Sequence, residues 1–280
     1  MVDRKVLILG GRGMLGTDLT SLCRQRGYDV RSLDLPEFDI TDENQLRQAV
    51  EGFSTIVNCA AYTNVDGAES ERELAHEVNA RAVGRLGSLA RDANAWVLHI
   101  STDFVFDGVS DEPYNETDTP NPINEYGRSK LAGEVLLGQS GSRHCIMRIE
   151  WSYGAAGNNF PRKLVVKAKT DNELNVVDDQ VGSPTATTEI AATICELLSR
   201  RPEGIFHFAN DGYVSRYDMA RFIVDTLGLN VDLRSCRTGD YVCPAARPLN
   251  SRFDCSKIKC LLQQPIQSWE GALERFLRQL

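Results

Sequence analysis

Long apolar segments are missing from this chain of 280 residues. No stretch approaches the roughly 20 consecutive apolar residues that a membrane-spanning helix requires. The apolar run at residues 6–9 ends at a glycine, which makes it too short for the core of a signal peptide. We therefore expect a cytoplasmic protein that has no membrane partner.

Signals for metal and nucleic-acid binding are equally scarce. The eight cysteines form no CxxC pair, and no histidine cluster lies near them, so the sequence predicts a reduced protein without a metal site. The formal net charge of −8 argues against a nucleic-acid partner, because phosphate contacts need clustered lysine and arginine. A small anionic ligand is still compatible with this charge, since it needs only a local positive potential.

Strand-like and helix-like segments alternate through the first 150 residues. Continuous apolar runs are typical of strands that are buried on both faces. The predicted strands cover residues 6–9, 29–33, 55–59, 96–100 and 145–149, and the predicted helices cover residues 14–26, 41–50, 69–92 and 126–138. This order predicts an α/β fold with a Rossmann-type, doubly wound parallel sheet, and a dinucleotide-binding domain over residues 1–150.

The pattern loosens after residue 150, where no repeat and no flexible linker is found. The predicted helices there cover residues 159–170, 187–199 and 216–227 and begin again at 268, and the predicted strands cover residues 174–177 and 205–208. We expect residues 151–280 to form mainly a smaller α/β substrate-binding lobe, with some segments free to return to the first domain. A cleft should then lie between the two parts.

A glycine-rich turn follows the first predicted strand. Gly10, Gly13 and Gly16 fit the pattern GxxGxxG, and the next helix opens with Met14 and Leu15. Glycines at these positions allow a tight turn and a close approach of the backbone to a pyrophosphate at the helix N-terminus. The motif predicts dinucleotide binding; the alternative is a tight turn that only packs the helix on the strand.

Two residues of opposite charge bear on the choice of dinucleotide. Asp34 ends the second strand, where a carboxylate would hold the adenosine ribose hydroxyls and disfavour a 2′-phosphate. Arg12, in the glycine turn, could instead pair with that phosphate. The sequence therefore predicts NADPH or NADH without deciding between them. Asp39 and the following Ile40 are candidates for the adenine site, although Asp39 could equally cap a helix.

The end of the third strand carries small side chains that would let a cofactor lie against the backbone. The candidates are Cys59, Ala60, Ala61 and Tyr62. A contact between helix and strand would explain the same small residues, but we favour the cofactor.

Tyr126 and Lys130 are the strongest catalytic candidates. Four residues apart on a helix, they share one face, and a nearby cation lowers the pKa of a phenol. Such a tyrosine can give a proton to a carbonyl oxygen, although YxxxK also arises by chance on helix surfaces. Ser101 and Thr102 end the fourth strand, where ligands of doubly wound sheets bind, or they simply form a turn.

Six segments together resemble the extended short-chain dehydrogenase/reductase family, and within it most closely the branch of the dTDP-4-dehydrorhamnose reductases. They are GGRGMLG, NCAAYTNVDGAE, STDFVFDG, PYNETDTPNPINEYGRSKLAGE, VVDDQVGSPT and RPLNSRFD. The last two are far more specific than the glycine turn. The resemblance implies an NAD(P)H-dependent oxidoreductase that reduces the C4 keto group of dTDP-6-deoxy-L-lyxo-4-hexulose to give dTDP-L-rhamnose.

The resemblance also implies roles for individual residues. Thr102 would orient the substrate carbonyl, Tyr126 would be the general acid, and Lys130 would bind the nicotinamide ribose. Ser101 would lie beside the cofactor. The residues that would line the nucleotide-sugar pocket are Asp103, Phe104, Trp151, Asn159, Gln180, Thr185 and Arg247. Among these, Arg247 is the candidate ligand of the diphosphate, with a buried ion pair as the alternative, and Trp151 could stack on the sugar.

Some positions depart from the family pattern. Phe104 stands where a tyrosine is usual and Glu150 where small or hydroxyl residues are commoner, which leaves the sugar open. Some members bind Mg²⁺ through glutamates at a dimer interface; here Asp18, Glu189 and Glu270 hold those positions, so the resemblance gives Mg²⁺ little support. It is compatible with a homodimer.

Two other functions fit the same motifs. One is a reductase or an epimerase/reductase that acts on another nucleotide sugar. The other is a non-catalytic, dinucleotide-binding regulatory subunit, since the regulatory subunit of methionine adenosyltransferase resembles the same family.

Overall fold

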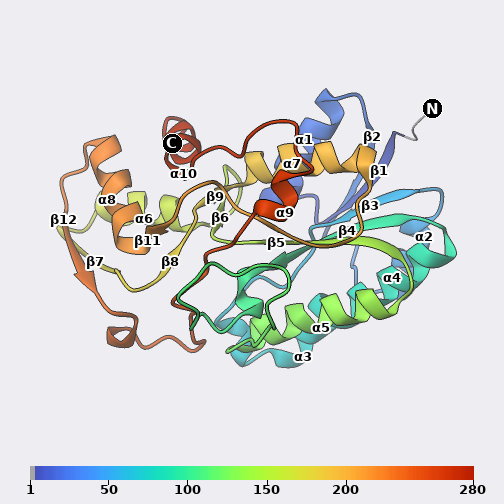
Figure 1. The fold of residues 1–280 in the computed structure, drawn as a ribbon, viewed down its shortest axis with the longest axis horizontal. Coiled ribbons are helices and arrows are strands. Elements are labelled where there is room, and N and C mark those ends of the chain that lie inside the picture. Colours follow the sequence, from blue (N-terminus) through green and yellow to red (C-terminus); the bar gives the residue numbers. More distant parts are fainter. Residues whose placement is uncertain (1–3) are drawn as a thin grey trace.

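A six-stranded parallel sheet forms the centre of the computed structural model, which describes residues 4–280 (Figure 1). Its strands are β1 (Lys5–Leu9), β2 (Asp29–Leu33), β3 (Thr55–Asn58), β4 (Trp96–Thr102), β5 (Arg143–Ile149) and β10 (Gly204–Phe208). They lie in the order β10-β5-β4-β3-β1-β2, and every neighbouring pair is parallel. The predicted doubly wound α/β fold is thereby confirmed. Residues 1–3 lie outside the described residues. They belong to the predicted dinucleotide-binding domain and to the N-terminal segment for which we expect no signal peptide.

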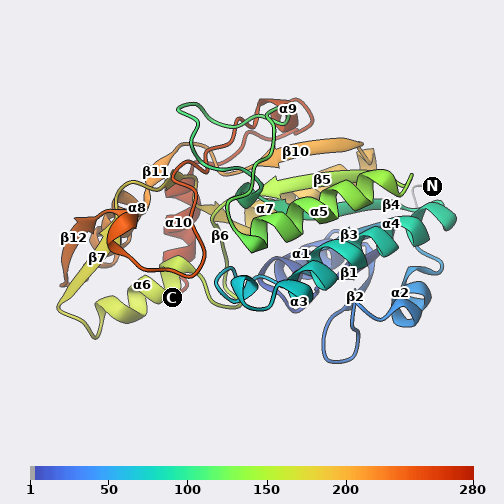
Figure 2. The ribbon, with the colours of Figure 1, turned by 90° about the horizontal axis from the view of Figure 1, so that it is seen from below.

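Helices cover both faces of this sheet (Figures 1 and 2). One face is covered by α1 (Met14–Gln25) and α7 (Thr187–Arg200), which pack together. The other is covered by α2 (Glu43–Val50), α4 (Ala82–Asp92) and α5 (Glu125–Gln139). Because the strand order reverses beside β1, the carboxyl ends of β1 and β3 border a crevice of the kind in which doubly wound sheets bind ligands.

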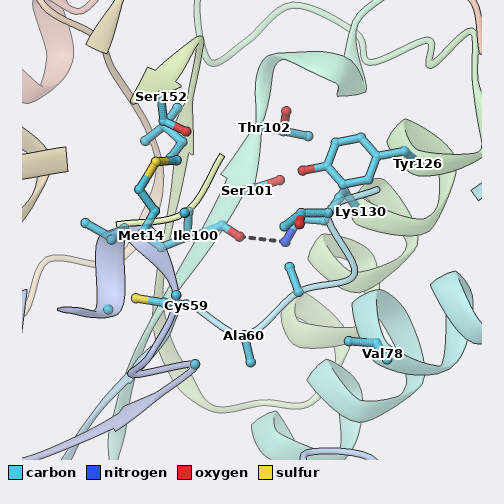
Figure 3. A pocket seen from close by; sticks show the side chains of 18 of the residues that line it. Met14, Cys59, Ala60, Val78, Ile100, Ser101, Thr102, Tyr126, Lys130 and Ser152 are labelled. Carbon is cyan, nitrogen blue, oxygen red and sulfur yellow. Dashed lines mark hydrogen bonds between the residues drawn. The ribbon is translucent and has the colours of Figure 1, made fainter. Parts of the chain in front are cut away.

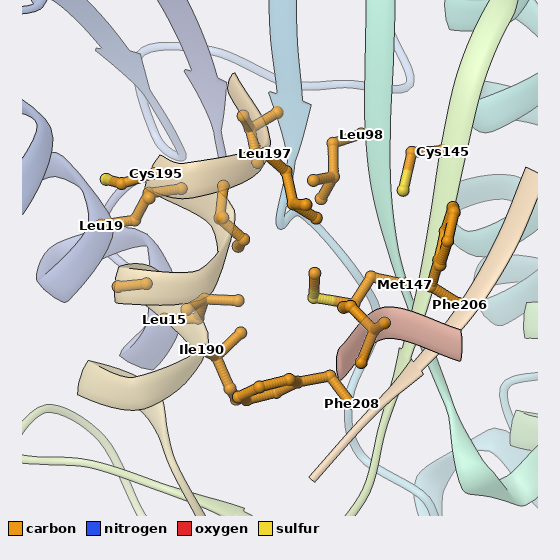
Figure 4. Packing of buried hydrophobic residues seen from close by; sticks show 14 of the residues in the cluster. Leu15, Leu19, Leu98, Cys145, Met147, Ile190, Cys195, Leu197, Phe206 and Phe208 are labelled. Atoms are coloured by element: carbon orange, nitrogen blue, oxygen red, sulfur yellow. The ribbon is translucent and has the colours of Figure 1, made fainter. Parts of the chain in front are cut away.

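The two faces of the sheet are buried by separate groups of apolar side chains. Along β1, Ile8 points to the face of α1 and α7, while Leu7 and Leu9 point to the face of α2 and α4. In Figure 4, side chains of α1 and α7 face Leu98 and Met147 of the central strands. Burial on both faces explains why the central strands read as unbroken apolar runs.

The predicted helix over residues 69–92 begins only at Arg72 and contains a π-helical turn. A 3-10 turn, η1 (Gly67–Glu69), is followed by α3 (Arg72–His76), by a π-helical turn, η2 (Glu77–Arg81), and only then by α4. The π turn carries the buried Asn79, whose side chain accepts a hydrogen bond from the Tyr62 backbone N–H and donates to the Ser129 hydroxyl. A π turn inserts one extra residue, and here it points an amide at the loop after β3.

A second lobe is built from shorter pieces, at the left of Figure 1. Its strands form three two-stranded pairs: β7 (Glu173–Val177) with β12 (Asp232–Cys236), β8 (Val181–Gly182) with β11 (Val214–Ser215), and β6 (Ser152–Tyr153) with β9 (Thr185–Ala186). Its helices are α6 (Phe160–Ala168), α8 (Arg216–Leu227) and α10 (Trp269–Leu277). Apolar side chains of these helices form a core of their own.

The chain crosses between the two parts more than once. After β6 the chain enters the lobe. It returns to the first part as α7, which packs on α1, and as β10, which pairs with β5 at the edge of the large sheet. It then supplies α8 and β12 to the lobe and comes back as the short α9 (Ser256–Lys259), which contacts β10. The remaining elements are the 3-10 turns η3 (Asp103–Val105) and η4 (Thr238–Asp240). No helix within residues 4–280 is long and apolar enough to cross a membrane.

Candidate active site

A cavity of about 600 Å³ lies at the carboxyl ends of the strands, where the sheet meets the lobe. The glycine turn, the ends of β3 and β4 and the start of α5 form its walls, and Trp151 and Arg216 close it on the lobe side. In Figure 3, Met14 and Cys59 lie on one side of this cavity and Tyr126 on the other. The structure thus brings the predicted catalytic residues and all the predicted cofactor residues except Arg12 and Tyr62 into the lining of one space.

The glycine turn has the shape that a bound pyrophosphate needs. Gly10 has a φ of +76°, and a Cβ at this position would lie 2.5 Å from the backbone nitrogen of Ala60. A Cβ on Gly16 would lie 2.1 Å from the carbonyl oxygen of Gly10. Gly13 is the N-cap of α1 and offers no side chain to the first N–H groups of the helix. These groups face the cavity unblocked, which is the arrangement that binds phosphates at helix N-termini.

Asp34 lines the cavity at the end of β2 and is hydrogen-bonded to Arg12, which does not line the cavity. The Asp34 carboxylate accepts hydrogen bonds from the backbone N–H groups of Arg12 and Leu35, each at 2.8 Å. The Arg12 guanidinium points away, to the Leu35 carbonyl at 2.7 Å and to the Glu37 carboxylate at 2.6 Å. Asp39 lines the cavity and also accepts from the backbone and the hydroxyl of Thr41.

Lys130 points its ammonium at the end of β4. Its Nζ donates to the Ile100 carbonyl at 2.7 Å, a bond drawn in Figure 3, and lies 3.3 Å from Nε2 of His99. The side-chain oxygen of Asn58 accepts from Ala60, so its NH₂ group faces Nδ1 of His99. The proton of this neutral imidazole therefore lies on Nε2, the ring nitrogen that faces the Lys130 side chain.

Burial lowers the pKa of Lys130 to about 8, against the opposing influence of Glu134 and Cys59. Burial, and then the charge of Lys130, also lowers the pKa of His99 well below its usual value. A lysine in this state holds its proton weakly, which is a property of functional rather than structural lysines.

Tyr126 has a raised pKa, which corrects the expectation that Lys130 lowers it. Burial is the main cause, the Asp103 carboxylate adds to it, and a hydrogen bond with Thr102 opposes it. The Lys130 ammonium is directed at Ile100 rather than at the phenol, so it gives no compensating field. Tyr126 lies in the first turn of α5, where Asn124 caps the helix, and its ring meets Phe104 edge-on at 5.6 Å. It is therefore a phenol that carries its proton.

Thr102 and Asp103 form a buried hydrogen-bond chain beside this phenol. The Thr102 hydroxyl donates to the Asp103 carboxylate at 2.9 Å, and the Ser251 hydroxyl donates to its other oxygen at 2.5 Å. Burial raises the pKa of Asp103, while these two hydrogen bonds oppose the rise. Ser251 was not predicted, although it lies within RPLNSRFD, the segment that marks the family branch.

A family model described as the RmlD substrate binding domain matches residues 4–280. The chain belongs to this family. It is 38% identical to a dTDP-4-dehydrorhamnose reductase of Aggregatibacter actinomycetemcomitans over 96% of this chain and 97% of that one. It is 35% identical to the dTDP-4-dehydrorhamnose reductase of Salmonella typhimurium over 98% and 97%. The crystal structure of such a reductase from Bacillus anthracis in complex with NADP superimposes with a TM-score of 0.94, at 35% identity and 99% coverage of both chains.

Six of the residues predicted to bind the substrate line one of two cavities, and two line neither. Thr102, Asp103, Phe104 and Trp151 line the large cavity, whereas Gln180 and Arg247 line a second cavity of about 340 Å³ in the lobe. Asn159 and Thr185 line neither of these two cavities: Asn159 caps α6 and donates to the Gly154 carbonyl, and the Thr185 hydroxyl donates to the Ser183 carbonyl.

Some predicted cofactor residues also make local contacts. Tyr62 lies outside the lining of both cavities, and its hydroxyl donates to Glu71. Ser101 lines the large cavity, but its hydroxyl donates to Glu134, which pairs with the buried Arg148 at 2.6 Å.

Glu150 and Trp151 both line the large cavity. One carboxylate oxygen of Glu150 accepts from the Ser183 N–H at 2.7 Å and the other from the Phe253 N–H at 3.3 Å. The departure from the family pattern at Glu150 therefore ties β5 to both branch-specific segments. Trp151 has a φ of +43°, and the guanidinium of Arg216 covers its ring at 3.4 Å, so only the rest of the indole can face a sugar.

Two of the three acidic residues that the family resemblance places at a magnesium site, Asp18 and Glu189, have other partners. Asp18 accepts from the Thr187 hydroxyl, and Glu189 pairs with Arg275. Within residues 4–280, no group of three or more His, Cys, Asp or Glu side chains is placed to hold a metal ion.

Proposed function

We propose that this protein is a dTDP-4-dehydrorhamnose reductase, which uses NADPH or NADH to reduce the C4 keto group of dTDP-6-deoxy-L-lyxo-4-hexulose to dTDP-L-rhamnose. The observation that carries the proposal is that Thr102, Tyr126 and Lys130 line the same cavity as the glycine turn. Membership of the family and the names of its relatives give the substrate.

The residues divide the work of such a reduction. The cofactor, when bound, supplies the hydride. The glycine turn and the N-terminus of α1 hold its pyrophosphate, and Lys130 reaches its ribose next to the reaction centre. Tyr126 gives its proton to the keto oxygen as the alcohol forms, and the Thr102 hydroxyl turns from Asp103 to donate to that oxygen and hold it in place. The wall of Trp151 keeps the sugar on the side of the phenol.

The state of the cysteines bears on the compartment in which the enzyme acts. All eight cysteines are free, which supports a reducing compartment, and we propose that the enzyme acts in the cytoplasm on a nucleotide sugar. A homodimer is the assembly we would test first, by light scattering.

The decisive experiment measures turnover with dTDP-6-deoxy-L-lyxo-4-hexulose and with other nucleotide keto-sugars, for the wild type and for Tyr126→Phe. A general acid contributes about 10²- to 10⁴-fold, so we expect Tyr126→Phe to lose at least 100-fold in kcat while NADPH affinity is retained. Tyr28→Phe, which lies before β2 and away from the cavity, is the matched control.

Two outcomes would contradict the proposal. Unchanged turnover in Tyr126→Phe would remove this residue from its role. NADPH binding without turnover of any keto-sugar by the wild type would instead favour a regulatory, non-catalytic protein.

A further inference from the structure

Arg216 occupies the passage between the two cavities. It is the first residue of α8, and it lines both the large cavity and the lobe cavity. Its guanidinium lies 3.4 Å above the Trp151 ring and 5.1 Å from the Phe160 ring. Two aromatic rings thus fix the position of this cation without using any of its N–H groups.

The N–H groups of the Arg216 guanidinium have no hydrogen-bond acceptor among the described residues. Within residues 4–280 it makes no ion pair shorter than 4.0 Å and no side-chain hydrogen bond, and only its backbone N–H is engaged, by Gln180. Arg247, by contrast, donates to the Asp66 carboxylate and to the Ala245 carbonyl, both at 2.9 Å. Of these two cations in the lobe cavity, Arg247 is therefore already neutralised and Arg216 is not.

Two carboxylates face Arg216 without neutralising it by contact. Asp103 and Glu150 both act on it electrostatically, but their oxygens are held by other groups. Asp103 accepts from the hydroxyls of Thr102 and Ser251, and Glu150 from two backbone N–H groups. Burial lowers the pKa of Arg216 to about 10, so the side chain stays charged at neutral pH.

The order of the cavities matches the order of groups in the substrate. With the keto-sugar at Tyr126 in the large cavity, the nucleoside extends toward the lobe cavity, and the diphosphate between them passes Arg216. A planar guanidinium with free donors suits two phosphate oxygens at once, and the N-terminus of α8 adds a favourable dipole. We propose that Arg216, rather than the sequence-predicted Arg247, is the principal ligand of the diphosphate. This inference rests on the proposed function.

The test compares the binding of dTDP, by titration calorimetry, to the wild type, Arg216→Gln, Arg216→Lys and Arg247→Gln. Hydrogen bonds to a charged group carry about 10- to 100-fold in affinity, so Arg216→Gln should weaken dTDP binding by at least tenfold. Arg216→Lys, which keeps the charge but loses the fork, should fall between the wild type and Arg216→Gln. Arg247→Gln should stay within about threefold of the wild type.

NADPH affinity and a cooperative thermal unfolding transition report on the fold, and both should be retained in the three variants. The inference is overturned if Arg216→Gln binds dTDP within threefold of the wild type. It is also overturned if Arg247→Gln weakens dTDP binding more than Arg216→Gln does, because Arg247 would then be the principal ligand. Turnover by the wild type is scored separately: dTDP binding without reduction of the keto-sugar would sink the proposed function and leave the assignment of Arg216 standing.

Discussion

The buried ammonium of Lys130 destabilises the folded protein, so replacing this lysine by an uncharged residue should make the protein more stable. The side chain is only 2% exposed, and burial lowers its pKa from 10.5 to about 8. One pKa unit corresponds to about 1.4 kcal/mol, so the buried ammonium costs the folded state about 3 kcal/mol. Replacement by methionine keeps the unbranched shape and removes this charge.

Part of the gain is offset by a lost hydrogen bond. The Ile100 carbonyl, which accepts from Nζ at 2.7 Å, is left without that donor, at a cost of about 1 kcal/mol. We therefore expect Lys130→Met to be more stable than the wild type by about 2 kcal/mol at pH 7, by subtracting that loss from the ionisation cost.

The pH dependence separates this cause from better packing. The folded state has the lower pKa, so the unfolded chain binds more protons between pH 8 and pH 10.5 and wild-type stability rises through this range. Below about pH 8 the folded state bears the full cost of burying the Lys130 ammonium. This cost falls as the pH rises from 8 to 10.5, because the lysine of the unfolded chain then loses its proton as well. The advantage of Lys130→Met should therefore shrink to nothing by about pH 10.

Urea unfolding, followed by tryptophan fluorescence at pH 7 and at pH 10, measures both quantities. Lys163→Met, on an exposed face of α6, is the control and should change stability little at either pH. A Lys130→Met protein that is less stable than the wild type at pH 7, or whose advantage is the same at both pH values, would refute the reasoning.

Two further changes test the cofactor site. A Cβ on Gly16 would lie 2.1 Å from the backbone oxygen of Gly10, whereas a Cβ on Gly13 would lie 3.2 Å from it. Gly16→Ala should therefore lower the free energy of unfolding by about 1–3 kcal/mol in urea, and equal stabilities of Gly16→Ala and Gly13→Ala would contradict the turn geometry. Glu37 pairs with Arg12 at 2.6 Å, so Glu37→Gln should free the guanidinium for a 2′-phosphate and raise the NADPH-to-NADH affinity ratio severalfold in fluorescence titrations; an unchanged ratio would exclude this role of Arg12.

Local patterns carried most of the fold. The unbroken apolar runs predicted the central strands because those strands are buried on both faces, and the helix predicted over residues 41–50 is found as α2, which Asp42 caps. The π turn at residues 77–81 escaped prediction, because it depends on Asn79 meeting the loop after β3 and the Ser129 hydroxyl. Such contacts join segments far apart in the chain and leave no periodic signal.

Spacing and family motifs singled out Tyr126, Lys130 and Thr102, and the structure places all three in the lining of one cavity. Their catalytic roles stay predictions. The direction of the Tyr126 pKa could not be found from the sequence, because it depends on how deeply the phenol is buried and on where the Lys130 ammonium points. Arg216 lies in an ordinary stretch at the start of a helix, and only its place between two cavities distinguishes it.

The raised pKa of Tyr126 fits the direction of the proposed reaction. A reductase needs a phenol that carries its proton when the ketone arrives, whereas an enzyme that oxidises an alcohol needs the phenolate. Burial and the Asp103 carboxylate both hold the proton on the phenol, and the same carboxylate engages the Thr102 hydroxyl. A single buried acid thus keeps the proton donor loaded and orients its neighbour, while the charge of Lys130 is directed at Ile100 and does not withdraw that proton.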